Sequence, residues 1–158
     1  MALALCWRHF LFDLDENYIG EIPSEIIYPS GGTQLTELYL SNNKIDSIPD
    51  GLFQLQNVTH LWLSSNKISS ALPSGLGMMK KLVELDLERN FFTGTIPDEI
   101  YSLVNLQALF LYDNILTGTL SPSLSQMKSL KILDLHTNYI SGVIPTQIGL
   151  LSQLTELQ

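Results

Sequence analysis

The chain has one cysteine, few basic residues and no long uncharged apolar run. Cys6 alone cannot form an internal disulfide, so cysteine usage gives no sign of an oxidising compartment. The 8 Lys and Arg face 16 Asp and Glu, and the formal net charge of -8 opposes binding to the phosphate backbone of nucleic acids. No stretch of about 18 residues is apolar and uncharged, so we expect no membrane insertion of this segment. Residues 2–7 are apolar, but they lack the basic start and the length of a signal peptide.

An asparagine recurs at an almost constant interval. Successive members lie 26, 23, 24, 24 and 24 residues apart: Asn17, Asn43, Asn66, Asn90, Asn114 and Asn138. A fixed period of this length predicts a solenoid. We expect a single array with units at about residues 9–34, 35–57, 58–81, 82–105, 106–129 and 130–153, a partial unit at 154–158 and no cap at either end. In the first unit, the residues between Ile26 and Leu35 have the composition of a loop, which predicts a bulge in the repeat.

Each unit has the pattern of one short strand and an irregular return path. Leu85 and Leu87 alternate with polar residues before Asn90, which is the period of a strand buried on one face. Strands from successive units run the same way and predict a parallel sheet. On the return path, Pro97 follows Ile96 and favours turns, polyproline-like segments or brief 3₁₀ helices.

The asparagines predict a structural ladder. Where each strand ends, the chain turns inward and leaves buried backbone N–H and C=O groups that need partners. An amide side chain offers two donors and an acceptor. Stacked once per unit, the six asparagines are therefore expected to bind backbone groups of their own and adjacent turns.

The segment from Leu82 to Asn105, LVELDLERNFFTGTIPDEIYSLVN, resembles the plant-type leucine-rich repeat LxxLxLxxNxLxGxIPxxLxxLxx. The resemblance runs from about residue 9 to the end, although the units at Asn17 and Asn43 lack the motif's glycine. It implies an α/β fold, a right-handed horseshoe solenoid with a parallel β-sheet on the concave face and short 3₁₀ or irregular segments on the convex face. It also implies a second short strand after the asparagine and a likeness to receptor-like kinases, receptor-like proteins and secreted inhibitors of cell-wall hydrolases, which bind peptides, proteins or co-receptors.

In this fold the residues between the strand leucines point to the concave surface, where aromatic and acidic types dominate. Large aromatic side chains exposed together are enriched at protein interfaces. The alternative is that these side chains cover the sheet and bind nothing. The candidate ligand-binding residues are Tyr39, His60, Trp62, Glu84, Asp86, Glu88, Phe110, Tyr112, Asp134 and His136.

No catalytic or metal-binding constellation stands out. Asp134 and His136 project from one strand, but a metal site needs three or four convergent ligands, and columns two units apart are about 10 Å distant. Neither a serine beside a base nor a glycine-rich phosphate loop is found. We therefore expect no enzymatic activity, no metal and no cofactor. Asn57 begins an N-glycosylation triplet, and Arg89 is expected to pair with Asp113 on the next unit.

The sequence is interpreted as a non-catalytic recognition module that binds a peptide or protein on its concave face, within a receptor-like or secreted protein. One alternative is a ligand-sensing ectodomain segment of a receptor kinase whose catalytic domain is not in this chain. Another is an intracellular protein-interaction scaffold. The family resemblance favours an extracellular or cell-surface location.

Overall fold

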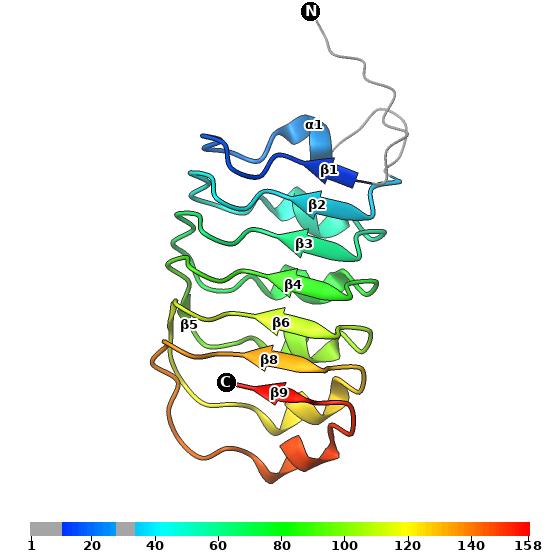
Figure 1. Ribbon diagram of the computed structural model, residues 1–158, viewed down its shortest axis with the longest axis vertical. Coiled ribbons are helices and arrows are strands. Elements are labelled where there is room, and N and C mark those ends of the chain that lie inside the picture. Colours follow the sequence, from blue (N-terminus) through cyan, green and yellow to red (C-terminus); the bar gives the residue numbers. More distant parts are fainter. Residues whose placement is uncertain (1–10, 28–33) are drawn as a thin grey trace, which may run out of the picture.

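The computed structural model describes residues 11–27 and 34–158, so Cys6 and most of the loop predicted before Leu35 lie outside the described residues. Seven short strands form one parallel sheet in the order β1-β2-β3-β4-β6-β8-β9. Neighbouring strands in the sheet come from consecutive units, so the chain coils once per unit, as Figure 1 shows. This confirms the predicted solenoid. The strands are β1 (Leu11–Asp13), β2 (Glu37–Tyr39), β3 (His60–Trp62), β4 (Glu84–Asp86), β6 (Ala108–Phe110), β8 (Ile132–Asp134) and β9 (Glu156–Leu157).

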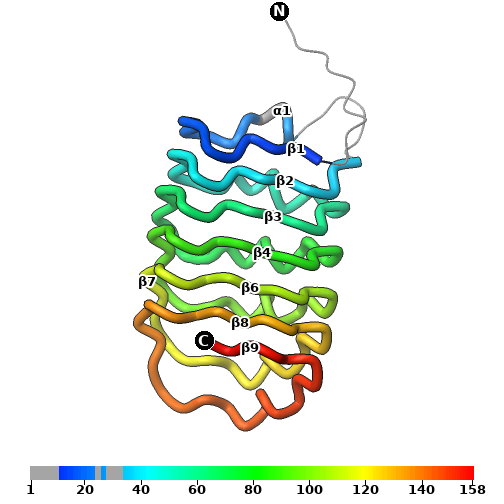
Figure 2. The backbone as a smooth tube through the Cα atoms, viewed as in Figure 1, coloured from blue at the N-terminus to red at the C-terminus, as the bar shows by residue number. Residues whose placement is uncertain are grey.

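The return path consists mainly of 3₁₀ helices, which lie behind the sheet (Figures 1 and 2). Four of the five begin directly after a proline with extended backbone, at Pro49, Pro73, Pro97 and Pro145. Proline fixes φ near the value that a helix start requires, so it sets where each turn begins. The first unit differs, because it carries a short α-helix, α1 (Ser24–Ile27). The 3₁₀ helices are η1 (Asp50–Gln54), η2 (Ser74–Met78), η3 (Asp98–Ser102), η4 (Pro122–Gln126) and η5 (Thr146–Leu150).

The return segments pack closely on one another. A Cβ atom placed on Gly77 in η2 would lie 2.5 Å from the carbonyl oxygen of Glu99 in η3, which is closer than real contacts allow. Glycine at this position therefore permits the spacing between these two units. Within residues 11–27 and 34–158, no helix has the length and apolarity needed to cross a bilayer.

A second, two-stranded sheet forms on the turn side, from β5 (Thr93–Gly94) and β7 (Ile115–Leu116). It confirms the implied second strand for the units of Asn90 and Asn114. Gly94 and Gly118 have φ of 71° and 81°, a left-handed conformation that glycine adopts at little cost.

The core lies between the concave sheet and the return path. The central leucine of each middle strand is the register partner of the next, and none is more than 1% exposed. Burial of one such side chain contributes about 1.5–3 kcal/mol, so each unit is stabilised mainly by its neighbours. The row consists of Leu38, Leu61, Leu85, Leu109 and Leu133.

Buried asparagines tie adjacent turns together. Asn90 is 4% exposed, and its Nδ2 donates to the carbonyls of Leu63, Leu87 and Glu88 at 2.9, 3.3 and 3.1 Å. Its Oδ1 accepts from the backbone N–H of Ile68 at 3.1 Å. Two of these four partners belong to the preceding unit. The same pattern of bonds is made by Asn43, Asn66, Asn114 and Asn138.

Asn17 differs from the other members of the ladder. It is exposed, and among the described residues its Nδ2 donates to the carbonyls of Leu14 and Asp15 in its own turn. Within residues 11–27 and 34–158, Asn17 thus has the local bonds of the ladder and no bond to another turn.

The residue before each asparagine adopts a left-handed conformation, which redirects the chain at the end of the strand. All six are non-glycine residues with φ between 51° and 58°, a conformation that is strained for side chains with a Cβ. They are Glu16, Asn42, Ser65, Arg89, Asp113 and Thr137.

Arg89 does not pair with Asp113, so that prediction is wrong. The single ion pair among the described residues joins His136 and Asp134. The Arg89 guanidinium instead lies over the ring of Tyr112, 5.5 Å from its centroid, because the neighbouring unit offers an aromatic face within cation–π range.

Candidate ligand-binding site

The concave surface consists of three columns of side chains. The first column is Leu11, Glu37, His60, Glu84, Ala108 and Ile132, and the central column is Asp13, Tyr39, Trp62, Asp86, Phe110 and Asp134. The third column follows the strands and is Asp15, Ser41, Ser64, Glu88, Tyr112 and His136. Members of the first two columns are direct register partners, so side chains of successive units lie one strand spacing apart, about 4.8 Å.

An aromatic pair lies in the central column at β2 and β3. The rings of Tyr39 and Trp62 are stacked, with centroids 4.1 Å apart and an interplanar angle of 18°. The Tyr39 hydroxyl donates to a carboxylate oxygen of Glu37 at 2.6 Å. Burial of the Tyr39 hydroxyl, together with this bond and the charge of Glu37, raises the pKa of Tyr39. The pair is therefore held in place before any ligand arrives.

Trp62 carries a polar group that its surroundings leave unused. Its indole Nε1 is buried and has no hydrogen-bond partner among the described residues. A buried donor without an acceptor costs about 1–3 kcal/mol. The position is thus poorly optimised for stability, which is a common property of residues kept for function.

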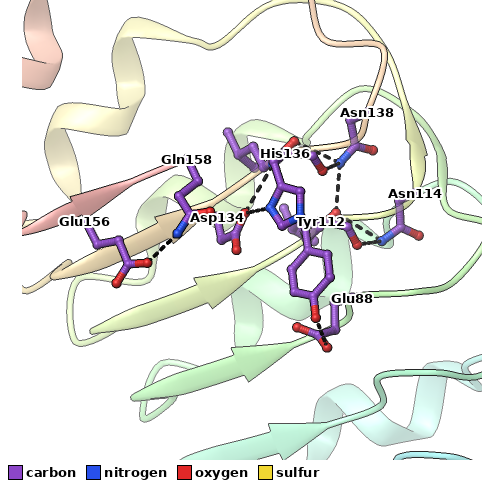
Figure 3. Close-up of polar contacts among 10 residues, drawn as sticks. Glu88, Tyr112, Asn114, Asp134, His136, Asn138, Glu156 and Gln158 are labelled. Carbon is purple, nitrogen blue, oxygen red and sulfur yellow. Dashed lines mark hydrogen bonds and ion pairs between the residues drawn. The ribbon is translucent and has the colours of Figure 1, made fainter.

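A second cluster occupies the columns near β6 and β8, as Figure 3 shows. The His136 ring stacks on Tyr112, with centroids 4.4 Å apart, and its Nδ1 lies 2.5 Å from an Asp134 carboxylate oxygen. The Tyr112 hydroxyl points at Glu88 and donates a hydrogen bond to it. Burial and this contact with Glu88 raise the pKa of Tyr112 to about 12. Asp134 is only 7% exposed, so it supports His136 more than it presents a free charge.

Three carboxylates of one unit lie in a row across the centre of the concave surface. Glu84, Asp86 and Glu88 are spaced two residues apart and occupy the first, central and third columns. Burial raises the pKa of Asp86 to about 6, and the charges of Glu88 and Glu84 add to the rise. The backbone N–H of Glu88 and the Ser64 hydroxyl oppose it by hydrogen bonding. Asp86 is therefore a partly buried acid with acidic neighbours and no basic partner in the described chain.

The charges of the protein are segregated. The three columns contain seven of the 16 Asp and Glu and none of the 8 Lys and Arg. Single-sign surfaces of this kind speed the approach of ligands of opposite charge. The seven acids are Asp13, Asp15, Glu37, Glu84, Asp86, Glu88 and Asp134.

The remaining sequence candidates are placed as follows. His60 is half-buried in the first column and contacts the Thr59 hydroxyl through Nδ1 at 2.9 Å. Asn57 is exposed on the loop before β3, where its Oδ1 accepts from Lys81 Nζ at 2.8 Å, and its glycosylation stays a prediction. Glu37 was missed as a candidate, although its position two residues before Tyr39 is the signal that would have identified it.

The polar clusters do not form a catalytic or metal-binding arrangement in the part of the chain that the structure describes. No group of three or more His, Cys, Asp or Glu there could hold a metal ion. The imidazole of His136 has Asp134 as its side-chain partner, and among residues 11–27 and 34–158 no hydroxyl or thiol group is hydrogen-bonded to this imidazole.

Comparisons with known proteins agree with this architecture. Two family models, both described as leucine rich repeat, match residues 33–92 and residues 105–127 and 129–151. Receptor-like protein 32 of Arabidopsis thaliana is 37% identical over 86 residues, which are 54% of this chain and 10% of that protein.

Two solved structures from Arabidopsis thaliana are similar. One is the ectodomain of the plant membrane receptor kinase GASSHO1/SCHENGEN3 in complex with CASPARIAN STRIP INTEGRITY FACTOR 2, with a TM-score of 0.81 and 37% identity over 87% of this chain and 16% of that chain. The other is the ectodomain of the receptor kinase HAESA in complex with an IDA peptide hormone ligand, with a TM-score of 0.76 and 34% identity over 78% of this chain and 21% of that chain. The chain thus spans less than a quarter of each of these relatives. Its repeats, its solenoid and these matches together show that it belongs to the leucine-rich-repeat family.

Proposed function

We propose that this chain is a non-catalytic recognition module that binds a peptide or an extended protein segment on the concave face of its sheet. The observation that carries the proposal is the row of aromatic and acidic side chains in register across the strands, from Tyr39 to Asp134. Aromatic anchors bury a large area at low entropic cost, which is why they dominate binding energy at interfaces.

The dimensions of the row suit a short extended ligand. From Asp13 to Asp134 the central column crosses five strand spacings, about 24 Å, which is the length of an extended peptide of about seven residues. The stacked Tyr39–Trp62 pair lies in the central column, and the stacked Tyr112–His136 pair lies beside it in the third column. Preformed rings reduce the ordering cost of binding.

The similar proteins support a receptor-like context. The GASSHO1/SCHENGEN3 and HAESA ectodomains were solved as complexes, the latter with a peptide hormone. We infer that this chain contributes part of a ligand-binding or co-receptor surface of a receptor-like protein, and that any catalytic activity of the parent protein resides outside this segment.

The experiment that tests the proposal starts from peptides selected against the purified chain from a random display library. The affinities of the selected peptides are then measured for the unsubstituted chain and for its variants Trp62→Ala and Phe110→Ala, with circular dichroism as a check of folding. Each substitution should weaken binding about tenfold or more, as expected for an aromatic anchor. The matched control is Phe91→Ala, because Phe91 is 50% exposed and lies outside the three columns.

Binding that is unchanged by Trp62→Ala and Phe110→Ala, and lost on changing the return-path residues Lys128 or Asp98, would place the site on the other face of the solenoid.

A further inference from the structure

Asp86 stands between two aromatic side chains that belong to different units. Trp62 and Phe110 are its register partners on β3 and β6. Two strand spacings, about 9.6 Å, therefore separate the backbone positions that carry the two rings, with a carboxylate halfway between them. A cation placed over Asp86 would be about 5 Å from each flanking row, which is inside the range of cation–π attraction.

One face of the Trp62 indole is turned toward this position. Tyr39 stacks on Trp62 from the β2 side, so the opposite face of the indole is directed to the β4 side, where Asp86 lies. Phe110 makes no ring contact with another aromatic side chain among the described residues. Trp62 and Phe110 thus each keep a ring face that no other aromatic side chain of the described residues covers.

The charges at this position have no internal counterion. Glu84 and Glu88 flank Asp86, and none of the three forms an ion pair in the described part of the chain. Glu88 is engaged by the Tyr112 hydroxyl, and Asp86 accepts a hydrogen bond from the Glu88 backbone N–H. Neither Glu84 nor Asp86 has a cationic partner among the described residues, so both are left for an external cation. Like charges brought together in a partly buried site repel one another, and a bound cation would remove that repulsion.

We propose that Trp62, Asp86, Glu84 and Phe110 form a subsite for an arginine side chain of an extended peptide ligand. The inference rests on the concave-face function proposed above and names the chemistry of one ligand residue. Arginine is favoured over lysine because its planar guanidinium can stack on an aromatic face while its N–H groups pair with a carboxylate.

The test uses capped glycine–serine peptides of equal length with one central residue varied. Arginine is compared with citrulline, a neutral isostere, and with lysine. The readout is the NMR signal of the Trp62 indole N–H, assigned by its persistence in Trp7→Phe. The arginine peptide should shift this signal and bind about tenfold more tightly than the citrulline peptide, with lysine between them.

Two protein variants locate the effect. Asp86→Asn keeps the shape of the side chain and should reduce arginine binding about tenfold, whereas Asp98→Asn, an exposed acid at the start of η3, should change it less than about twofold. Phe110→Leu keeps an apolar side chain without a ring face and should also weaken arginine binding. If Asp86→Asn loses binding because it disturbs the local structure, Phe110→Leu still provides an independent test of the subsite.

The subsite is overturned if the arginine peptide leaves the Trp62 signal unmoved, if citrulline binds equally well, or if Asp98→Asn weakens binding as much as Asp86→Asn. The last result would mean that the net charge of the protein alone attracts the arginine peptide. The broader function is judged separately, because library-selected peptides that depend on Trp62 without containing arginine would retain the concave-face site and reject only the arginine assignment.

Discussion

Substitution of Asn90 by alanine would remove one rung of the asparagine ladder from the middle of the solenoid. Asn90 is buried, and its Oδ1 is the partner of the Ile68 N–H, while its Nδ2 bonds the Leu63 carbonyl of the preceding unit. Alanine leaves both backbone groups without these partners. An unsatisfied buried group costs about 1–3 kcal/mol, so we expect Asn90→Ala to lower the free energy of unfolding by about 2–4 kcal/mol.

Asn17→Ala is the matched control for this prediction. It is the same change at the same place in a repeat, but Asn17 is exposed and, among the residues that the structure describes, bonds its own turn alone. Its cost should be about 0.5 kcal/mol or less, as for ordinary surface substitutions. Urea unfolding followed by circular dichroism measures both variants against the parent, and the denaturant slopes show whether the units still unfold together. Equal costs for Asn90→Ala and Asn17→Ala, within about 0.3 kcal/mol, would refute the cross-linking role of the buried asparagines.

Three further predictions concern single positions. Folding raises the pKa of Asp86 from 3.8 to about 6, so the folded state favours the protonated carboxyl group. The stability that protonated Asp86 contributes is present below about pH 4 and is lost as the pH rises through 6. The asparagine of Asp86→Asn cannot ionise, so between about pH 4 and 7 the free energy of unfolding of this variant should rise by about 1–3 kcal/mol relative to that of the unsubstituted chain, as measured by urea unfolding. Gly77→Ala should lower the melting temperature, because its Cβ would meet the Glu99 carbonyl oxygen at 2.5 Å, and an unchanged value would mean that η2 and η3 can separate freely. Thr137→Asn should stabilise by about 0.5–1 kcal/mol in the same unfolding assay, because Thr137 has φ of 53° and asparagine tolerates that conformation better; a loss of stability would show that the threonine side chain has an unrecognised contact.

The fold could be predicted from the sequence because its determinants are local and repeated. A period of about 24 residues, leucines at fixed places and a proline before most return turns specify the solenoid, the sheet and its register. Since one unit cannot bury its apolar face alone, the units must stack, and stacking sets which side chains become neighbours. The columns that contain Tyr39, Trp62 and Asp86 follow directly from that alignment.

What the sequence could not provide are the contacts that side chains make with one another, within a unit or between units. The alignment placed Arg89 beside Asp113, but it could not reveal that the guanidinium turns to the Tyr112 ring. It placed Asp134 on the concave surface without showing that the carboxylate is buried beside His136. Such outcomes depend on rotamers and on competition among neighbours, which a one-dimensional pattern does not encode.

The first unit shows a second limit of the repeat pattern. The short helix α1 replaces the 3₁₀ turn of the later units, and in the part of the chain that the structure describes Asn17 bonds its own turn alone. Repeat-based prediction assumes that each unit has the same surroundings, and the different composition of the first unit does not meet that assumption.

The most direct test of the central claim is a crystal structure of this chain bound to a peptide selected for affinity. We expect the peptide to lie across β2, β3, β4 and β6 on the concave face, in contact with Trp62 and Phe110. A peptide seated on the 3₁₀ helices of the return path, with these two side chains uncovered, would contradict it.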